Sequence, residues 1–243
     1  MKLLLLAGTR EARELSFLLG GIDLVSSLAG ATQRPAELGG HVRIGGFGGV
    51  SGLAEYLRAG RFDAVVDATH PFAAQMSRHA FEACARVGLP LLQLVRSPWE
   101  IKETWTLVPD LDAAAALLQA DAHVFLATGR GSLAHFKARS DVEFTTRVID
   151  DVDEAFPLAK GRFLVSRPPF SVEEEVKTLQ ELGVAVLVAR NSGGTGGIEK
   201  VIAADRLGLQ VVMVARPVLP EVPRAATVQE ALAMMEARGW LGA

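Results

Sequence analysis

Short apolar runs alternate with segments of helical periodicity along the first 95 residues. The runs are rich in Leu and Val and predict β-strands, whereas the periodic segments predict α-helices. The expected strands are 3–7, 22–28, 41–44, 64–68 and 91–95, and the expected helices are 11–19, 53–58 and 72–87. This alternation is typical of a parallel sheet covered by helices on both faces.

The alternation stops at residues 96–109 and then resumes. Prolines bound a polar stretch there, and proline disfavours both a preceding helix and a central strand, so we expect a connection. Beyond it the expected strands are 124–127, 143–149, 163–165, 184–189 and 211–214, and the expected helices are 110–119, 133–137, 172–182, 198–207 and 228–238. The residues suited to cap three of these helices are Asp110, Ser171 and Thr227.

The two stretches share one rhythm, which predicts an α/β protein of two Rossmann-like lobes, each with a parallel sheet. We expect residues 1–95 to form an NADPH-binding lobe and residues 96–243 to form a second, substrate-binding lobe. The active-site cleft is expected between them. A chain of 243 residues is long enough for such a division.

Composition and charge argue against several classes of protein. Lys plus Arg is 25 and Asp plus Glu is 28, which gives a net charge of −3, whereas a nucleic-acid surface needs a basic excess. No apolar run reaches the ~20 residues of a membrane helix, so we expect a cytoplasmic protein without a membrane partner. Cys84 is the only cysteine, so no disulfide or zinc site is expected, and its helical apolar context predicts a buried thiol.

The first expected strand leads into Gly8, Thr9 and Arg10, which open the following helix. A glycine at such a turn lets the backbone approach a phosphate, and the helix N-terminus supplies N–H donors and positive potential. The match to the G-x-G-x-x-G pattern is poor, because Arg10 and Arg13 stand where its second and third glycines would be. The loop therefore indicates a nucleotide phosphate site or a plain tight turn.

The end of the second expected strand favours NADPH over NADH. Enzymes that bind NAD usually carry an acidic residue there for the ribose hydroxyl, but Asp23 lies at the strand's beginning. The positions after the strand offer hydroxyls and a guanidinium, which suit the 2′-phosphate of NADPH. The candidates are Arg10, Ser27, Thr32 and Arg34, the alternative being that Thr32 and Arg34 belong to a solvated loop.

Two further loops of the first lobe follow strands at the same expected edge. A glycine-rich loop is placed to cover the dinucleotide, or serves as a flexible connection: Gly45, Gly46, Phe47 and Gly48. A polar cluster after the next strand is placed to meet nicotinamide or substrate: Asp67, Thr69 and His70. Thr69 also suits a helix cap, with Pro71 in the first turn.

Three loops of the second lobe follow strands and open helices. Each offers hydroxyls, backbone N–H groups and a basic side chain. The candidate ligand-binding residues are Gly129, Arg130 and Ser132 in the first loop, Arg167 and Ser171 in the second, and Ser192, Gly193, Gly194 and Lys200 in the third. Three such loops predict a large ligand with several negative charges, although Lys200 also fits a solvated helix position.

Several motifs follow one another in a characteristic order: residues 6–12, 27–30, 45–48, 67–73, 191–194 with 199–200 and 203–204, and 216–217. In this order they resemble the precorrin-6A reductase family of cobalamin (vitamin B12) biosynthesis. The resemblance covers nearly the whole chain, and the blocks at 67–73 and 192–200 are specific when found together. One departure is Arg10, where related chains often carry glycine.

The resemblance implies an NADPH-dependent reduction of one double bond of the precorrin-6A macrocycle, which gives precorrin-6B. This tetrapyrrole-derived substrate carries acetate and propionate carboxylates, which suit the loops of the second lobe. His70 and Asp67 become the catalytic candidates for positioning or for proton delivery, a proton from solvent being an equal alternative. The resemblance also implies that the product passes to the next enzyme of the pathway.

The sequence leaves two other interpretations open. One is the same reduction of cobalt-precorrin-6A, the cobalt-bearing substrate of the anaerobic route. The other is a nucleotide-sensing module without chemistry, although this leaves the basic loops of the second lobe unexplained. A short-chain reductase is disfavoured, because Tyr56 is the only tyrosine and Gly60 stands where its Tyr-x-x-x-Lys motif needs lysine.

Overall fold

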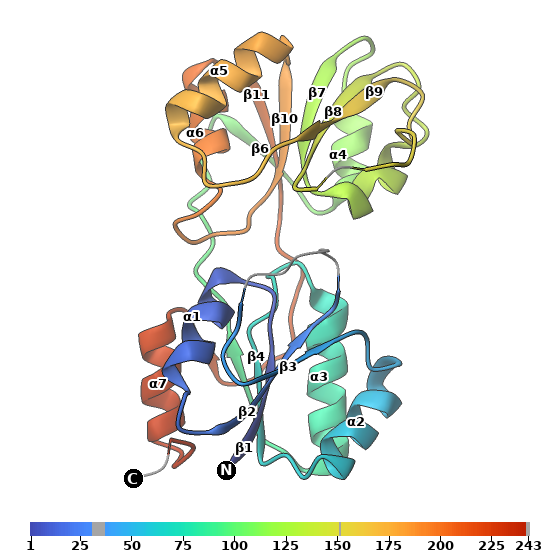
Figure 1. Cartoon of the computed structure of the whole chain (residues 1–243). Helices are drawn as coiled ribbons and strands as arrows, with labels where there is room; N and C mark the ends of the chain where they lie inside the picture. Colours follow the sequence, from blue (N-terminus) through green and yellow to red (C-terminus); the bar gives the residue numbers. More distant parts are fainter. Residues whose placement is uncertain (31–36, 151, 242–243) are drawn as a thin grey trace. The chain divides into compact units, whose positions relative to one another are not determined.

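The structure of the protein is a computed structural model that describes residues 1–30, 37–150 and 152–241. The chain forms two compact units. Unit 1 comprises Met1–Ser97 together with Pro217–Ala243, and unit 2 is Pro98–Arg216. Each unit belongs to the expected α/β class, with helices on both faces of a parallel sheet (Figure 1).

Unit 1 is built on a six-stranded parallel sheet with the order β12-β5-β4-β1-β2-β3. Its strands are β1 (Lys2–Leu6), β2 (Asp23–Leu28), β3 (His41–Ile44), β4 (Ala64–Asp67), β5 (Leu91–Leu94) and β12 (Arg224–Ala225). All four leucines of β1 are buried, because helices cover both faces of this central strand. The sequence of β1 is therefore a continuous apolar run rather than an alternation.

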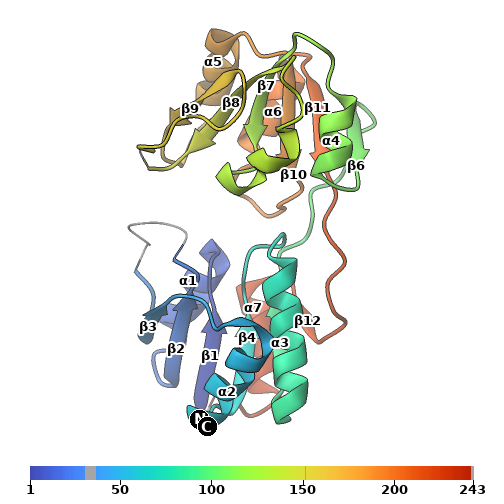
Figure 2. The ribbon, with the colours of Figure 1, turned by 90° about the vertical axis from the view of Figure 1, so that its right-hand side faces the viewer.

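Two helices cover each face of this sheet (Figures 1 and 2). They are α1 (Arg10–Leu18) and α7 (Val228–Glu236) on one face, and α2 (Gly49–Ala59) and α3 (Ala74–Val87) on the other. Leu3 and Leu5 pack into the first layer, and Leu4 and Leu6 into the second. Cys84 lies in the second layer as expected, where burial and then the charge of Asp67 raise the pKa of its thiol to about 12.

Unit 2 repeats this plan with the strand order β6-β11-β10-β7-β8-β9. Its strands are β6 (Trp105–Val108), β7 (His123–Ala127), β8 (Glu143–Val148), β9 (Gly161–Val165), β10 (Val186–Arg190) and β11 (Gln210–Val214). Helices α5 (Val172–Leu182) and α6 (Glu199–Arg206) cover one face, and α4 (Leu111–Leu117) with the 3₁₀ helix η1 (Arg130–Phe136) covers the other. The expected caps are confirmed at Asp110, Ser171 and Thr227.

Two strands lie where the sequence predicts none. Strand β6 falls inside the expected connection, because its middle residues, Thr106 and Leu107, are exposed at the sheet edge and conceal the strand pattern. Strand β12 has only two residues, too few for a periodic signal. In the part of the chain that the structure describes, no helix is long and apolar enough to cross a membrane.

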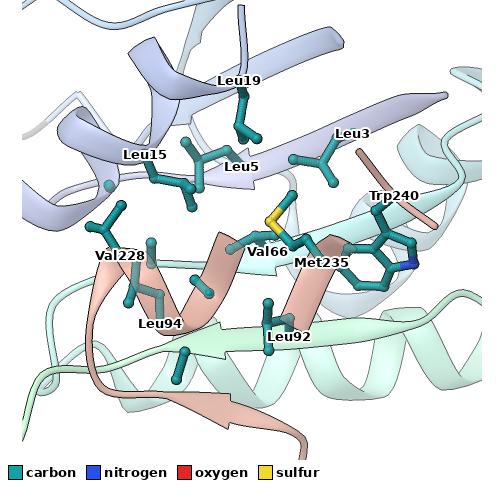
Figure 3. Close-up of a cluster of buried hydrophobic side chains, with 14 of the residues drawn as sticks. Leu3, Leu5, Leu15, Leu19, Val66, Leu92, Leu94, Val228, Met235 and Trp240 are labelled. Atoms are coloured by element: carbon teal, nitrogen blue, oxygen red, sulfur yellow. The ribbon is translucent and has the colours of Figure 1, made fainter. Parts of the chain in front are cut away.

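The expected division of the chain at residue 95 differs from the structure at the C-terminus. Residues from Pro217 onward belong to unit 1 rather than to the second lobe. The physical reason is the apolar face of α7, where Val228, Ala231 and Met235 complete the layer formed by Leu15 and the central strands (Figure 3). Helical periodicity predicts this helix but does not reveal which sheet it covers.

The packing of α7 gives a prediction about the stability of unit 1. Met235 is fully buried against the sheet, so Met235→Ala should lower the free energy of unfolding by about 2–5 kcal/mol through lost packing. Urea denaturation followed by circular dichroism measures this change. The matched control is Glu236→Ala at the next, exposed position, which should stay within about 0.5 kcal/mol of the parent. Equal effects of the two substitutions would contradict the assignment of α7 to this core.

Candidate functional site

The central position of β1 brings three loops of unit 1 together. Leu6 at the end of β1 lies in register with Ser27 of β2 on one side and Asp67 of β4 on the other. The carboxyl ends of these three strands therefore lie side by side at one edge of the sheet. The chain runs outward from β1 in both directions, so this edge is a topological switch point, where open α/β sheets bind their ligands.

The loop after β1 is organised by the hydroxyl of Thr9. Gly8 is exposed and has a φ of 153°, a conformation that favours glycine. Thr9 Oγ1 accepts the N–H of Ala12 at 3.0 Å, which caps α1, and donates to the carbonyl of Ala68 at 2.9 Å. Arg10 is exposed in the first turn of α1, where N–H groups lack partners within the helix. The loop thus has the features of a phosphate site.

Strand β3, which pairs with β2, carries an ion-binding candidate that the sequence interpretation missed. Arg43 Nη1 donates to Ser27 Oγ and to the carbonyl of Gly45, both at 2.8 Å, and Nη2 donates to the carbonyl of Gly46 at 3.0 Å. The guanidinium carbon lies 4.0 Å from the centre of the Phe47 ring. Arg43 and Ser27 are register partners across β2 and β3, which is a signal that sequence periodicity does not carry.

The glycine-rich loop after β3 is therefore folded around the side chain of Arg43. Gly45 and Gly48 have φ values of 126° and 78°, which let the chain turn sharply before α2. Ser27 is buried and belongs to the same cluster. Thr32 and Arg34, the other expected phosphate ligands, lie outside the described residues.

The loop after β4 is fixed by a buried carboxylate. Asp67 is 1% exposed, and its Oδ1 accepts the N–H of Thr69 at 3.1 Å and the hydroxyl of Thr69 at 2.7 Å. Its Oδ2 accepts Nε2 of Gln93 at 3.3 Å. His70 is half-buried, and its Nδ1 accepts the N–H of Phe72 at 3.2 Å. The neutral ring therefore carries its proton on Nε2.

Helix α3 begins at Ala74, two residues later than the sequence predicts. Its N-cap, Ala73, offers no side-chain hydrogen bond, so Thr69 does not cap this helix. The hydroxyl of Thr69 turns back to Asp67 instead. A separate turn results, closed by a 2.7 Å bond from the N–H of Ala73 to the carbonyl of His70.

Two expected ligand hydroxyls of unit 2 are used within the protein. Ser132 is fully buried, and its Oγ lies 2.6 Å from both Thr128 Oγ1 and the carbonyl of Gly129. Ser171 forms a capping box with Glu174 at the start of α5. Both serines therefore form hydrogen bonds that shape their own loops.

The basic side chains of the same two loops are exposed. Arg130 lies exposed after Gly129, whose φ of 80° makes the turn. Arg167 is exposed, pairs with Asp150, and donates to the carbonyl of Ile149 at 3.2 Å. These guanidinium groups stand close to the carboxyl ends of β7 and β9, which is the edge where a ligand of unit 2 is expected.

The third loop of unit 2 is held at several points. Asn191 is buried, and its side chain accepts the N–H of Trp99 at 2.8 Å and donates to the carbonyl of Trp99 at 3.0 Å. Trp99 Nε1 donates to the carbonyl of Gly194 at 2.8 Å. Arg216 Nη2 donates to the carbonyl of Ser192 at 2.9 Å. Gly193 and Gly194, with φ of 68° and 72°, let the backbone follow this path.

Lys200, in the first turn of α6, is bonded to this loop. Its Nζ donates to the carbonyl of Gly197 at 2.6 Å. Burial lowers the pKa of the Lys200 ammonium, while the charge of Glu175 opposes the change. Glu175 is 2% exposed and makes bonds of 2.5 and 2.8 Å to Arg147, which the sequence interpretation also missed and whose guanidinium lies 4.2 Å from the Phe170 ring centre. This buried ion pair anchors β8 to α5.

The chain matches known proteins over nearly its full length. The family described as "Precorrin-6x reductase CbiJ/CobK" matches residues 2–236. A precorrin-6A reductase of Rhodobacter capsulatus is 42% identical over 245 residues, covering 99% of this chain and 95% of the relative. A cobalt-precorrin-6A reductase of Priestia megaterium is 28% identical over 233 residues, covering 88% of this chain and 90% of the relative.

A solved structure extends the match to three dimensions. The structure of "CobK precorrin-6A reductase" superposes with a TM-score of 0.92 at 41% identity and covers 98% of both chains. The two parallel sheets and the order of their loops thus recur in a relative of high identity. The chain belongs to the precorrin-6x reductase CbiJ/CobK family.

Proposed function

We propose that the protein reduces one double bond of precorrin-6A with NADPH, in the pathway to cobalamin. The observation that carries this proposal is the 42% identity to a precorrin-6A reductase over 99% of the chain. The metal-free substrate is favoured over its cobalt form, because identity to the cobalt-precorrin-6A reductase is 28%. A cytoplasmic location is part of the same proposal.

The cofactor would lie across the switch point of unit 1. Gly8 and the first turn of α1 would face its diphosphate, and the loop from Asp67 to His70 would face its nicotinamide. The fit rests on the exposed turn at Gly8 and on the adjacency of the carboxyl ends of β1, β2 and β4. When bound, NADPH supplies the hydride, and the protein supplies orientation and electrostatics.

Arg43 is the group we assign to the 2′-phosphate, and Arg10 is a second candidate. Three of the five N–H donors of the Arg43 guanidinium bond to Ser27, Gly45 and Gly46. The other two N–H donors of Arg43 have no acceptor among the described residues. The bonds and the Phe47 ring hold the guanidinium in one orientation, which lowers the entropic cost of binding a phosphate.

The two catalytic candidates take different roles in this proposal. Asp67 is buried and bonds inward, so it acts as a positioning residue for Thr69 and the following turn. His70 is half-buried and carries its proton on Nε2 when neutral, so it is placed to orient the substrate or to deliver a proton to it. Thr69 helps to place His70, because its N–H and its hydroxyl are both bonded to Asp67.

Unit 2 would bind the carboxylates of the macrocycle. Arg130 and Arg167 offer exposed guanidinium groups, which bind carboxylates through paired hydrogen bonds. Gly193 and Gly194 would let the backbone come close to the ligand, while Lys200 holds their loop through its bond to the carbonyl of Gly197. A substrate with several negative charges explains why more than one loop of this unit carries a cation.

The reaction itself is tested with purified protein and precorrin-6A. We expect oxidation of one NADPH for each precorrin-6A consumed, followed by NADPH absorbance and by the mass of the product. Cobalt-precorrin-6A is expected to react more slowly. The absence of NADPH oxidation with either substrate would overturn the proposed function.

The role of Arg43 predicts a change in cofactor preference. Arg43→Ala should weaken NADPH binding by about 10- to 100-fold, the value of a hydrogen-bonded charge, and NADH binding by less than about 3-fold. Calorimetric titration measures both dissociation constants. Arg58→Ala, an exposed arginine on α2, is the matched control and should change neither. An equal loss for both cofactors would show that Arg43 only shapes the glycine-rich loop.

The role of His70 predicts a slower chemical step. His70→Ala should reduce the single-turnover rate of NADPH oxidation by about 100-fold, which is typical for loss of general acid catalysis. Cofactor affinity should remain close to that of the parent. His41→Ala serves as the control, because His41 begins β3 and so lies at the amino-terminal edge of the sheet, away from the loop that carries His70. An unchanged single-turnover rate in the His70 variant would remove this residue from the mechanism.

A further inference from the structure

A row of polar side chains crosses three neighbouring strands of unit 1; Asp67 and Gln93 are buried, and Arg224 is exposed on the edge strand. Arg224 of β12 is the register partner of Gln93 of β5, and Gln93 is the partner of Asp67 of β4. Register partners in a parallel sheet point to the same face, so the three side chains meet. Arg224 Nη2 donates to Gln93 Oε1 at 3.0 Å, and Gln93 Nε2 donates to Asp67 Oδ2 at 3.3 Å. We name these three residues the Arg224 row.

Burial of Gln93 and Asp67 forces these two side chains into one arrangement of donors and acceptors. Gln93 is fully buried and Asp67 is 1% exposed, so any unpaired polar atom there would be costly. The amide of Gln93 must turn its N–H toward the carboxylate and its oxygen toward the guanidinium. The exposed guanidinium of Arg224 is thereby linked to the buried carboxylate of Asp67 through one intervening amide.

The far end of the Arg224 row holds the loop that the proposed function places against nicotinamide. Asp67 Oδ1 fixes the N–H and the hydroxyl of Thr69, one residue before His70. Thr9 Oγ1 holds the carbonyl of Ala68 from the opposite side at 2.9 Å. The turn to His70 is thus held both by the cap of α1 and by the Arg224 row.

We propose that Arg224 and Gln93 are positioning residues for the reduction, acting through Asp67 and Thr69 on the placement of His70. The segment that returns from unit 2 would thereby set the geometry of the reacting edge of unit 1. This inference rests on the proposed function, in which His70 faces the reaction. A displacement of about 1 Å at a reacting centre costs on the order of 100-fold in rate.

Moving the carboxylate from residue 67 to residue 93, its neighbour in the row, tests the Arg224 row directly. In Asp67→Asn, whichever way the new amide turns, one of its N–H groups faces the donor of Gln93 or of Thr69. In Gln93→Glu, two carboxylates stand side by side. The double variant Asp67→Asn/Gln93→Glu restores every donor to an acceptor and brings the carboxylate next to Arg224.

The expected rates follow from this pairing. Each single variant should slow single-turnover NADPH oxidation by about 10- to 100-fold, and the double variant should return to within about 5-fold of the parent. The dissociation constant for NADPH should change by less than about 3-fold in all three. A double variant no faster than the slower single variant would overturn the proposal.

A measurement without substrate separates this inference from the role of His70. Arg224→Leu should accelerate hydrogen exchange at the amide of Thr69, which donates to Asp67, by about 10-fold. Arg238→Ala, in the same returning segment, is the matched control and should change neither exchange nor rate; among the described residues, the side chain of Arg238 donates to the carbonyl of Met234.

The outcomes are distinguishable. Faster exchange at Thr69 with rescue by the double variant supports the Arg224 row even if His70→Ala leaves the rate unchanged, in which case the proposed role of His70 alone fails. If Arg224→Leu lowers the free energy of unfolding but alters neither the exchange at Thr69 nor the rate, the Arg224 row only fastens β12, and the proposal is wrong.

Discussion

Burial of β1 on both faces is the constraint on which the site of unit 1 depends. Its four consecutive leucines are covered on both sides by helices, which places β1 in the middle of the sheet. From there it pairs in parallel with β2 and with β4, and parallel pairing brings the carboxyl ends of all three strands to one edge. For this reason the turn at Gly8, the side chain of Arg43 and the turn at His70 are neighbours.

Sequence periodicity predicted most of the fold, because strands buried on both faces are apolar throughout and helices end at recognisable caps. It failed where local signals are weak or absent. An edge strand such as Trp105–Val108 exposes two of its four residues, and Arg224–Ala225 is too short to show a pattern. The helix expected over 228–238 forms as Val228–Glu236, but its return to the first sheet depends on tertiary packing.

For the candidate site, the sequence indicates which strand ends lie together better than it indicates what each side chain bonds to. The carboxyl ends of β1, β2 and β4 do lie at one edge, as expected from parallel strands. Roles within them depend on hydrogen bonds that a sequence does not display. Ser132 and Ser171 turned out to shape their own loops, and Arg43 is revealed only by its register with Ser27. Asp67, a catalytic candidate from the sequence, is buried and bonds to Thr69 and Gln93.

The insertion of unit 2 between β5 and β12 has a consequence for synthesis on the ribosome. Chains emerge from the N-terminus and domains generally fold as units during translation. Unit 2 is continuous and is complete once Arg216 has emerged, whereas unit 1 still lacks β12 and α7. Until then the edge of β5 and the apolar layer at Leu15 stay uncovered, a state open to wrong pairing. The unit that is begun first is therefore finished last.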